Sequence, residues 1–267
     1  MELLQYIPEL LLAGAIAGFF AGLLGIGGGV VTIPALFTVF AQIGVPIEWR
    51  MHAAIGTSLA VIVATNLSSV YAHHKKGSVD WAIVKSWWIF VVIGAVGGSV
   101  FAKGLKTEEL IYFFAGLLGL LALKMLVPLD RLKLGDALPE GILQRLSPTV
   151  IGFFSSLMGI GGGSFTVPYL TLYGVPIHRA VGTAALTGLV ISISGGLGFL
   201  VEGLGIASLP RAMVGFIHIE SMIVVAIAAV LIAPFGAKAA HALPKAALSI
   251  IFGLFLVAAA VRMLSAL

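Results

Sequence analysis

The sequence GLLGIGGGVVTIPAL at residues 22–36 is repeated with changes at residues 156–170, which read SLMGIGGGSFTVPYL. Nine of the fifteen aligned positions are identical, including a glycine triplet and the Thr-x-Pro that follows it. Both copies lie in apolar, nearly uncharged surroundings, where three successive glycines are unfavourable in a continuous helix. A duplicated helix-breaking motif inside hydrophobic segments is typical of transporters whose site lies where two repeats meet.

The composition of the chain is that of an integral membrane protein. Of its 267 residues, 60% are hydrophobic and 10% are charged, whereas a soluble domain is roughly half apolar and a quarter charged. The apolar runs are long and continuous, which favours membrane-spanning helices over a barrel. The net charge of +4 does not indicate nucleic-acid binding, because most Lys and Arg lie between the apolar runs. We expect a lipid bilayer as the surroundings and no nucleic acid as a partner.

Several kinds of chemistry are not expected. The chain has no cysteine, so disulfides and thiolate metal sites are ruled out. It contains no H-E-x-x-H sequence, no paired aspartates within a span and no P-loop. We therefore expect no enzyme activity, no metal, no cofactor and no nucleotide hydrolysis within this chain.

The hydrophobic pattern predicts an all-α polytopic membrane protein. Segments long enough to span the bilayer are expected at about 53–72, 82–102, 109–128, 178–200, 211–235 and 244–265. The motif regions at about 8–43 and 147–174 are expected to form glycine-broken helical hairpins, or single broken spans. Each half then has one hairpin and three transmembrane helices.

The duplication extends beyond the motif and predicts two homologous repeats. Gly44-Val45-Pro46-Ile47 matches Gly174-Val175-Pro176-Ile177, and later segments also pair. We expect a first membrane repeat at 1–128, a polar cytoplasmic linker at 129–146 and a second repeat at 147–267, forming one transport domain. Basic residues near the spans divide nine to four if the motif regions are hairpins and eight to five if they cross. The positive-inside rule thus favours inverted repeats.

Glycine triplets inside a membrane suggest a binding site for an anion. Non-helical backbone is tolerated there only inside protein or beside a wet cavity, and glycine lets the chain turn. A helix that begins in mid-membrane directs amide donors and partial positive charge at its ligand. The expected substrate-binding residues of the two motifs are Gly27, Gly28, Gly29, Thr32, Pro34, Gly161, Gly162, Gly163, Ser164, Thr166 and Pro168. Each proline is expected early in its helix, where a missing N–H costs least. The alternative is that the glycines serve only close helix packing.

The doubled G-x-G-G-G-x-x-T-x-P-x-L signature, followed each time by Gly-Thr-Ser or Gly-Thr-Ala, resembles the TauE/SafE family of sulfite exporters and related permeases. The resemblance covers nearly the whole chain. It implies a secondary transporter of small sulfur-containing or organic anions, such as sulfite, thiosulfate or sulfonates. The backbone argument favours an anion independently, whereas the sulfur chemistry comes only from the resemblance.

Polar residues that follow the motifs have two interpretations. Thr57, Ser58 and Thr183 open the next long helix of each half and are expected to contact substrate, unless they cap helices or bond within them. Asn66 lies in the middle of a span, where we favour a helix–helix contact.

His218 and Glu220 are the ionisable groups best placed to couple transport to protons, because charged groups within spans often mark a pathway. Two alternatives are an ion pair of Glu220 with Lys85 and an interfacial position for both residues. Overall, the sequence predicts a multi-pass secondary transporter of the cytoplasmic membrane that moves a small anion by alternating access, with a proton as coupling ion. A passive anion channel is the alternative function, and no oligomeric state is assigned.

Overall fold

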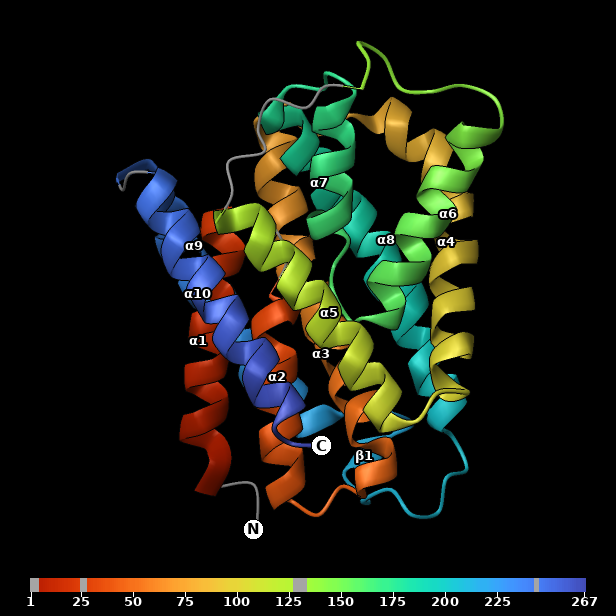
Figure 1. The fold of residues 1–267 in the computed structure, drawn as a ribbon, viewed down its shortest axis with the longest axis vertical. Helices are drawn as coiled ribbons and strands as arrows, with labels where there is room; N and C mark the ends of the chain where they lie inside the picture. The colour runs from red at the N-terminus through yellow and green to blue at the C-terminus, as the bar shows by residue number, and fades with distance from the viewer. Residues whose placement is uncertain (1–4, 25–27, 127–133, 243–244) are drawn as a thin grey trace.

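The computed structural model describes residues 5–24, 28–126, 134–242 and 245–267 of the chain, and these residues are almost entirely helical (Figure 1). The helices are α1 (Ile7–Leu24), α2 (Gly29–Gln42), α3 (Ile47–Lys75), α4 (Trp81–Lys103), α5 (Thr107–Leu126), α6 (Ile142–Leu157), α7 (Gly163–Leu172), α8 (Ile177–Gly203), α9 (Ile219–Ala242) and α10 (Lys245–Leu264). Strands β1 (Met213–Val214) and β2 (Ile217–His218) pair antiparallel just before α9.

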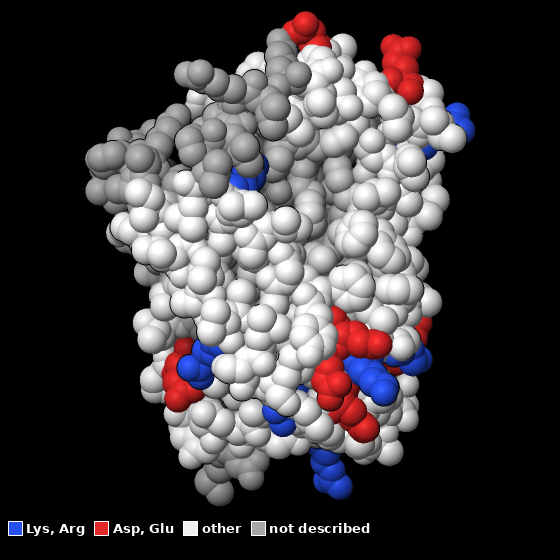
Figure 2. Space-filling model, viewed as in Figure 1, with Lys and Arg blue, Asp and Glu red and all other residues white. Residues whose placement is uncertain are grey.

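Five helices in the described part of the chain are long and apolar enough to cross a membrane. They are α3, α4, α5, α8 and the Ile219–Gly236 part of α9. On the face seen in Figure 2, charged side chains gather towards the two ends of the molecule and leave an uncharged band between them. This arrangement is that of an all-α polytopic membrane protein, as the sequence predicts.

Each motif region forms two helices that run in opposite directions. In Figure 1, α1 rises from the lower end and α2 returns to it, whereas α6 descends from the upper end and α7 returns there. α6 begins at Ile142, within the stretch that we expected to be linker. The opposite entry of the two hairpins favours inverted repeats, although the relation between the complete halves stays a prediction.

The helices of the two halves are interleaved. α1 packs along α9 and α6 packs along α4, while α3 lies against α8 and α5 against α10. Small residues allow these close approaches: a Cβ atom on Gly14 would lie 2.6 Å from the carbonyl oxygen of Val225, and one on Gly152 would lie 2.5 Å from that of Val91. The first arm of each hairpin is therefore held by a helix from the other half.

One expected span begins later than predicted. The segment expected at 211–235 becomes a helix only at Ile219, because residues 213–218 form the β1–β2 hairpin. The hairpin turns at Gly215, whose φ of 56° lies in the left-handed region that glycine tolerates. Because this segment is mostly apolar, a search for hydrophobic runs does not detect the turn.

Candidate functional site: the two glycine motifs

The second motif forms a tight loop between α6 and α7 in the interior of the protein. Gly159 and Gly162 adopt positive φ angles of 63° and 72°, and Gly162 is the N-cap residue of α7. The carbonyl oxygen of Gly162 accepts the amides of Phe165 and Thr166 at 3.1 and 2.8 Å. The amide of Gly162 donates to the carbonyl of Ile160 at 2.8 Å. The loop thus ends at the N-terminus of α7, as expected. One of its backbone amides, that of Gly162, already donates to a carbonyl within the loop.

The first motif is described from Gly28 onward, and Gly27 lies outside the described residues. Gly28 is the N-cap residue of α2, and its carbonyl oxygen accepts the amides of Val31 and Thr32. The hydroxyl of Thr32 donates to the same oxygen at 2.9 Å. The helix therefore begins at Gly29, directly after Gly28, the first glycine of the triplet that the structure describes.

The prolines lie deeper in their helices than we predicted. Pro34 is the sixth residue of α2, and Pro168 is the sixth residue of α7. At that depth a proline removes a helical hydrogen bond, because the carbonyl four residues earlier loses its donor. The expectation of a first-turn position with little cost was therefore wrong. The prediction that these prolines line a substrate site stays open.

The two motifs meet. A Cβ atom on Gly29 would collide with the carbonyl oxygen of Gly159 and would lie 3.1 Å from the Cα atom of Ile160. The hydroxyl of Ser58, on α3, donates to the same Gly159 oxygen at 3.0 Å. The start of α2, the α6–α7 loop and the middle of α3 are therefore in direct contact.

The second loop is also packed closely against α3 and α8. A Cβ atom on Gly161 would lie 2.6 Å from Cγ2 of Ile62, and one on Gly162 would lie 2.6 Å from Cδ1 of Ile191. Gly163 and Ser164, the first two residues of α7, are buried as well. Close packing and a binding role are compatible here, because a substrate site that is closed on both sides has such contacts.

Several buried polar atoms near the second loop have no hydrogen-bond partner among the described residues. They belong to Asn66, Ser155, Ser156 and Thr166. Thr166 differs in this respect from its repeat equivalent Thr32, whose hydroxyl is bonded to the backbone. Buried polar groups in proteins nearly always have partners, so a cluster of unpaired ones indicates a place where a ligand or water binds.

Thr57 and Thr183 make equivalent contacts that cross between the halves. The hydroxyl oxygen of Thr57 accepts the backbone amide of His218, directly before α9, at 3.0 Å. The hydroxyl oxygen of Thr183 accepts the backbone amide of Asp80, directly before α4, also at 3.0 Å. Both hydroxyls are thus engaged with helix starts, which is the capping alternative considered above. A contact of either residue with substrate stays a prediction.

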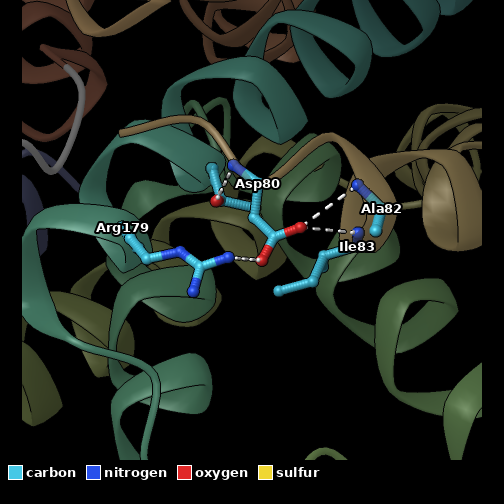
Figure 3. Close-up of polar contacts among 5 residues, drawn as sticks. Asp80, Ala82, Ile83 and Arg179 are labelled. Atoms are coloured by element: carbon cyan, nitrogen blue, oxygen red, sulfur yellow. Dashed lines mark hydrogen bonds and ion pairs between the residues drawn. The ribbon is translucent and has the colours of Figure 1, made fainter. Parts of the chain in front are cut away.

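Asp80 is a polar hub that the sequence analysis did not single out. Figure 3 shows one carboxylate oxygen of Asp80 accepting the amides of Ala82 and Ile83, while the other receives Arg179 from α8 at 2.5 Å. The available signal was an aspartate directly before an apolar helix, which is a typical N-cap. At the far ends of the same two helices, Lys103 pairs with Glu202 at 2.7 Å.

His218 and Glu220 have different surroundings. His218 is 3% exposed, and its Nδ1 atom accepts the amide of Ser221 at 3.2 Å, so that it caps α9. Burial lowers the pKa of the His218 imidazole, and the nearby Glu220 carboxylate opposes this shift. Glu220 itself is exposed in the first turn of α9. The structure places both residues at the start of this helix, and a role in proton coupling stays a prediction.

Comparisons with known proteins agree with this architecture. A probable membrane transporter protein from Haemophilus influenzae is 36% identical over 262 residues, which are 97% of this chain and 98% of that protein. The probable membrane transporter protein YdhB of Bacillus subtilis is 30% identical over 192 residues, 70% of this chain and 76% of YdhB. A probable membrane transporter protein from Methanocaldococcus jannaschii is 28% identical over 221 residues, 80% of this chain and 82% of that protein. No significant match exists among solved structures.

The multi-pass helical fold, the paired broken helices and these relatives define a membrane transporter. The model of one family, described as sulfite exporter TauE/SafE, matches residues 10–263. The chain belongs to this family.

Proposed function

We propose that this protein is a secondary transporter that moves a small sulfur-containing or organic anion across the cytoplasmic membrane by alternating access. The family description supports a sulfur oxyanion such as sulfite, thiosulfate or a sulfonate. The observation that carries the proposal is the start of α7 at Gly163 in the protein interior. The loop before it contacts the first motif, and unpaired buried polar groups lie beside that loop. A helix N-terminus in such surroundings favours a negative ligand.

A proton is the proposed coupling ion, with Glu220 and His218 as its carriers. Both residues lie at the start of α9, which is bound to α3 through Thr57 next to the motif contacts. The two hairpins, held by helices of the opposite half, are the parts proposed to rearrange between the open states. This arrangement resembles other transporters in which broken helices frame a central site.

The experiment is uptake of radiolabelled sulfite into proteoliposomes against a sulfite gradient, with and without a protonophore. A proton-coupled transporter accumulates sulfite, and the protonophore abolishes accumulation. A channel allows flow only down the gradient and would contradict the proposal.

Gly162→Ala is the variant that connects this activity to the motif. We expect this variant to lose uptake. A methyl group added at Gly162, the N-cap residue of α7, would lie 2.6 Å from Cδ1 of Ile191 on α8 and would displace the loop. The control is Gly44→Ala, at the repeat equivalent of Gly174. Gly44 has a similar φ of 80° but a Cβ atom there would meet nothing within 4 Å, so both variants share a backbone cost of about 1–2 kcal/mol. Equal uptake by the two variants would contradict a role of the α6–α7 loop in transport.

A further inference from the structure

Asn66 is a buried polar residue whose amide nitrogen has no hydrogen-bond partner in the part of the chain that the structure describes. It lies in the middle of α3, is 7% exposed, and its Nδ2 atom makes no hydrogen bond within the described residues. A primary amide has two N–H donors, and burying them unpaired destabilises a folded protein. A helix–helix contact, which we favoured from the sequence, would pair this group with a neighbouring helix.

The Asn66 amide lies directly against the loop of the second motif. Its Nδ2 atom is 3.3 Å from the position of a Cβ atom on Gly161 and 2.8 Å from that on Gly188 of α8. Gly161 immediately precedes Gly162, the N-cap residue of α7. The unpaired donor from the first half therefore lies against the residue that precedes the N-cap of α7 in the second half.

Thr166 provides a second unpaired group, which lies on α7 itself. It is fully buried in the first turns of α7. Its hydroxyl has no hydrogen-bond partner among the residues that the structure describes, although its amide is bonded to Gly162. The equivalent Thr32 shows that this position can bond its hydroxyl to the N-cap carbonyl. Helix geometry therefore allows the Thr166 hydroxyl to bond to the N-cap carbonyl, yet within the described residues it does not.

The electrostatic surroundings favour neutral donors. Among the residues whose burial the structure describes, no Asp, Glu, Lys or Arg is buried. An ion in the interior near these residues would therefore be held by amide and hydroxyl groups and by the helix dipole. Hydrogen bonds from neutral donors to an ionised oxygen are stronger than those between neutral groups.

We propose that Asn66 and Thr166 are substrate-binding residues, which donate from Nδ2 and Oγ1 to a small oxyanion at the N-terminus of α7. This assignment rests on the proposed transport function. The proposed site contains residues from both halves, because α3 supplies the amide and α7 supplies the hydroxyl. The assignment also makes the two motifs unequal, with the second one carrying the anion contacts named here.

The test is thermal unfolding of the full chain in detergent, titrated with sulfite and separately with methanesulfonate. Asn66→Leu removes both N–H donors and keeps a side chain branched at Cγ. We expect an unfolding midpoint without anion that is unchanged or higher, because no protein hydrogen bond is lost. We also expect half-maximal stabilisation to require at least about tenfold more anion. Thr65→Val is the control, since the Thr65 hydroxyl bonds only to Ile62 of its own helix.

A structural role of Asn66 would give the opposite pattern. A lower midpoint without anion, together with parental anion affinity, would overturn the assignment. If Leu prevents folding, Asn66→Ala removes the same donors with less volume, and anion affinity is then the deciding result. Absence of any anion stabilisation in the parent protein would contradict the proposed function itself, and with it this assignment.

Discussion

Glu220 and His218 are two residues apart, yet only Glu220 has an exposed side chain. His218 is buried and uses Nδ1 to accept an amide of α9, which requires that nitrogen to be unprotonated. Glu220 is exposed in the first turn of the same helix. At the scale of single residues, Glu220 is therefore the better candidate for carrying the coupling proton.

Glu220→Gln tests this difference. We expect uptake driven by an imposed pH gradient to fall, while stabilisation of the protein by anion stays unchanged, because the substitution removes a carboxyl group and leaves the donors of Asn66 and Thr166 in place. The control is Glu108→Gln, another exposed first-turn glutamate, on α5. Identical pH dependence of uptake in the Glu220 variant and the parent would remove Glu220 from the coupling step.

At the scale of elements, the crossed threonine contacts bind helices of opposite halves to one another. Thr57 of α3 accepts the amide before α9, and Thr183 of α8 accepts the amide before α4. In each pair the capping residue, His218 or Asp80, also accepts amides of its own helix. The same contact, in which a threonine hydroxyl accepts the amide of a helix-capping residue, thus occurs twice. This is expected when both halves descend from one repeat.

Thr57→Val should destabilise the protein by about 1–3 kcal/mol, because the buried amide of His218 loses its acceptor. Thr57→Ser keeps the oxygen and should stay close to the parent. The measurement is the free energy of unfolding in detergent, with hydrogen exchange at the start of α9 as a local readout. Parental stability combined with weaker anion binding would instead support the substrate contact that the sequence suggested for Thr57.

The sequence predicts most of the helices because their apolar runs are long and uninterrupted. The expected spans at 53–72, 82–102 and 178–200 all lie within α3, α4 and α8. The start of α9 was missed because the β1–β2 hairpin is as apolar as the helix that follows it. The positions of the glycine breaks were readable from the motif, since few residues other than glycine accept the φ of Gly162.

The contacts of the candidate site were less predictable. Thr57 and His218 are 161 residues apart, and no local pattern connects them. The different states of the Thr32 and Thr166 hydroxyls also have no counterpart in the sequence, because both residues occupy the same position of a repeated motif.

At the scale of the whole molecule, charged side chains on the face seen in Figure 2 gather towards the two ends and leave an uncharged band between them. Among the residues whose burial the structure describes, no Asp, Glu, Lys or Arg is buried. The interior around the second loop is closed, since Thr166 is fully buried. Transport by alternating access then requires a second arrangement in which this position is open to water. The central claim is that an anion binds at the N-terminus of α7 when it is exposed.

A single introduced thiol measures this exposure directly, because the chain contains no cysteine. Thr166→Cys replaces one proposed donor by a weaker thiol donor, so we expect slower transport that is not abolished. In proteoliposomes we expect its thiol to react with a charged, membrane-impermeant thiosulfonate reagent during transport, and methanesulfonate to slow the reaction. Ser99 lies on α4, is fully buried and packs against Gly198 of α8, so the thiol of Ser99→Cys should stay unreactive. A Thr166→Cys protein that transports while its thiol never reacts, or reacts at a rate that methanesulfonate does not change, would contradict the claim.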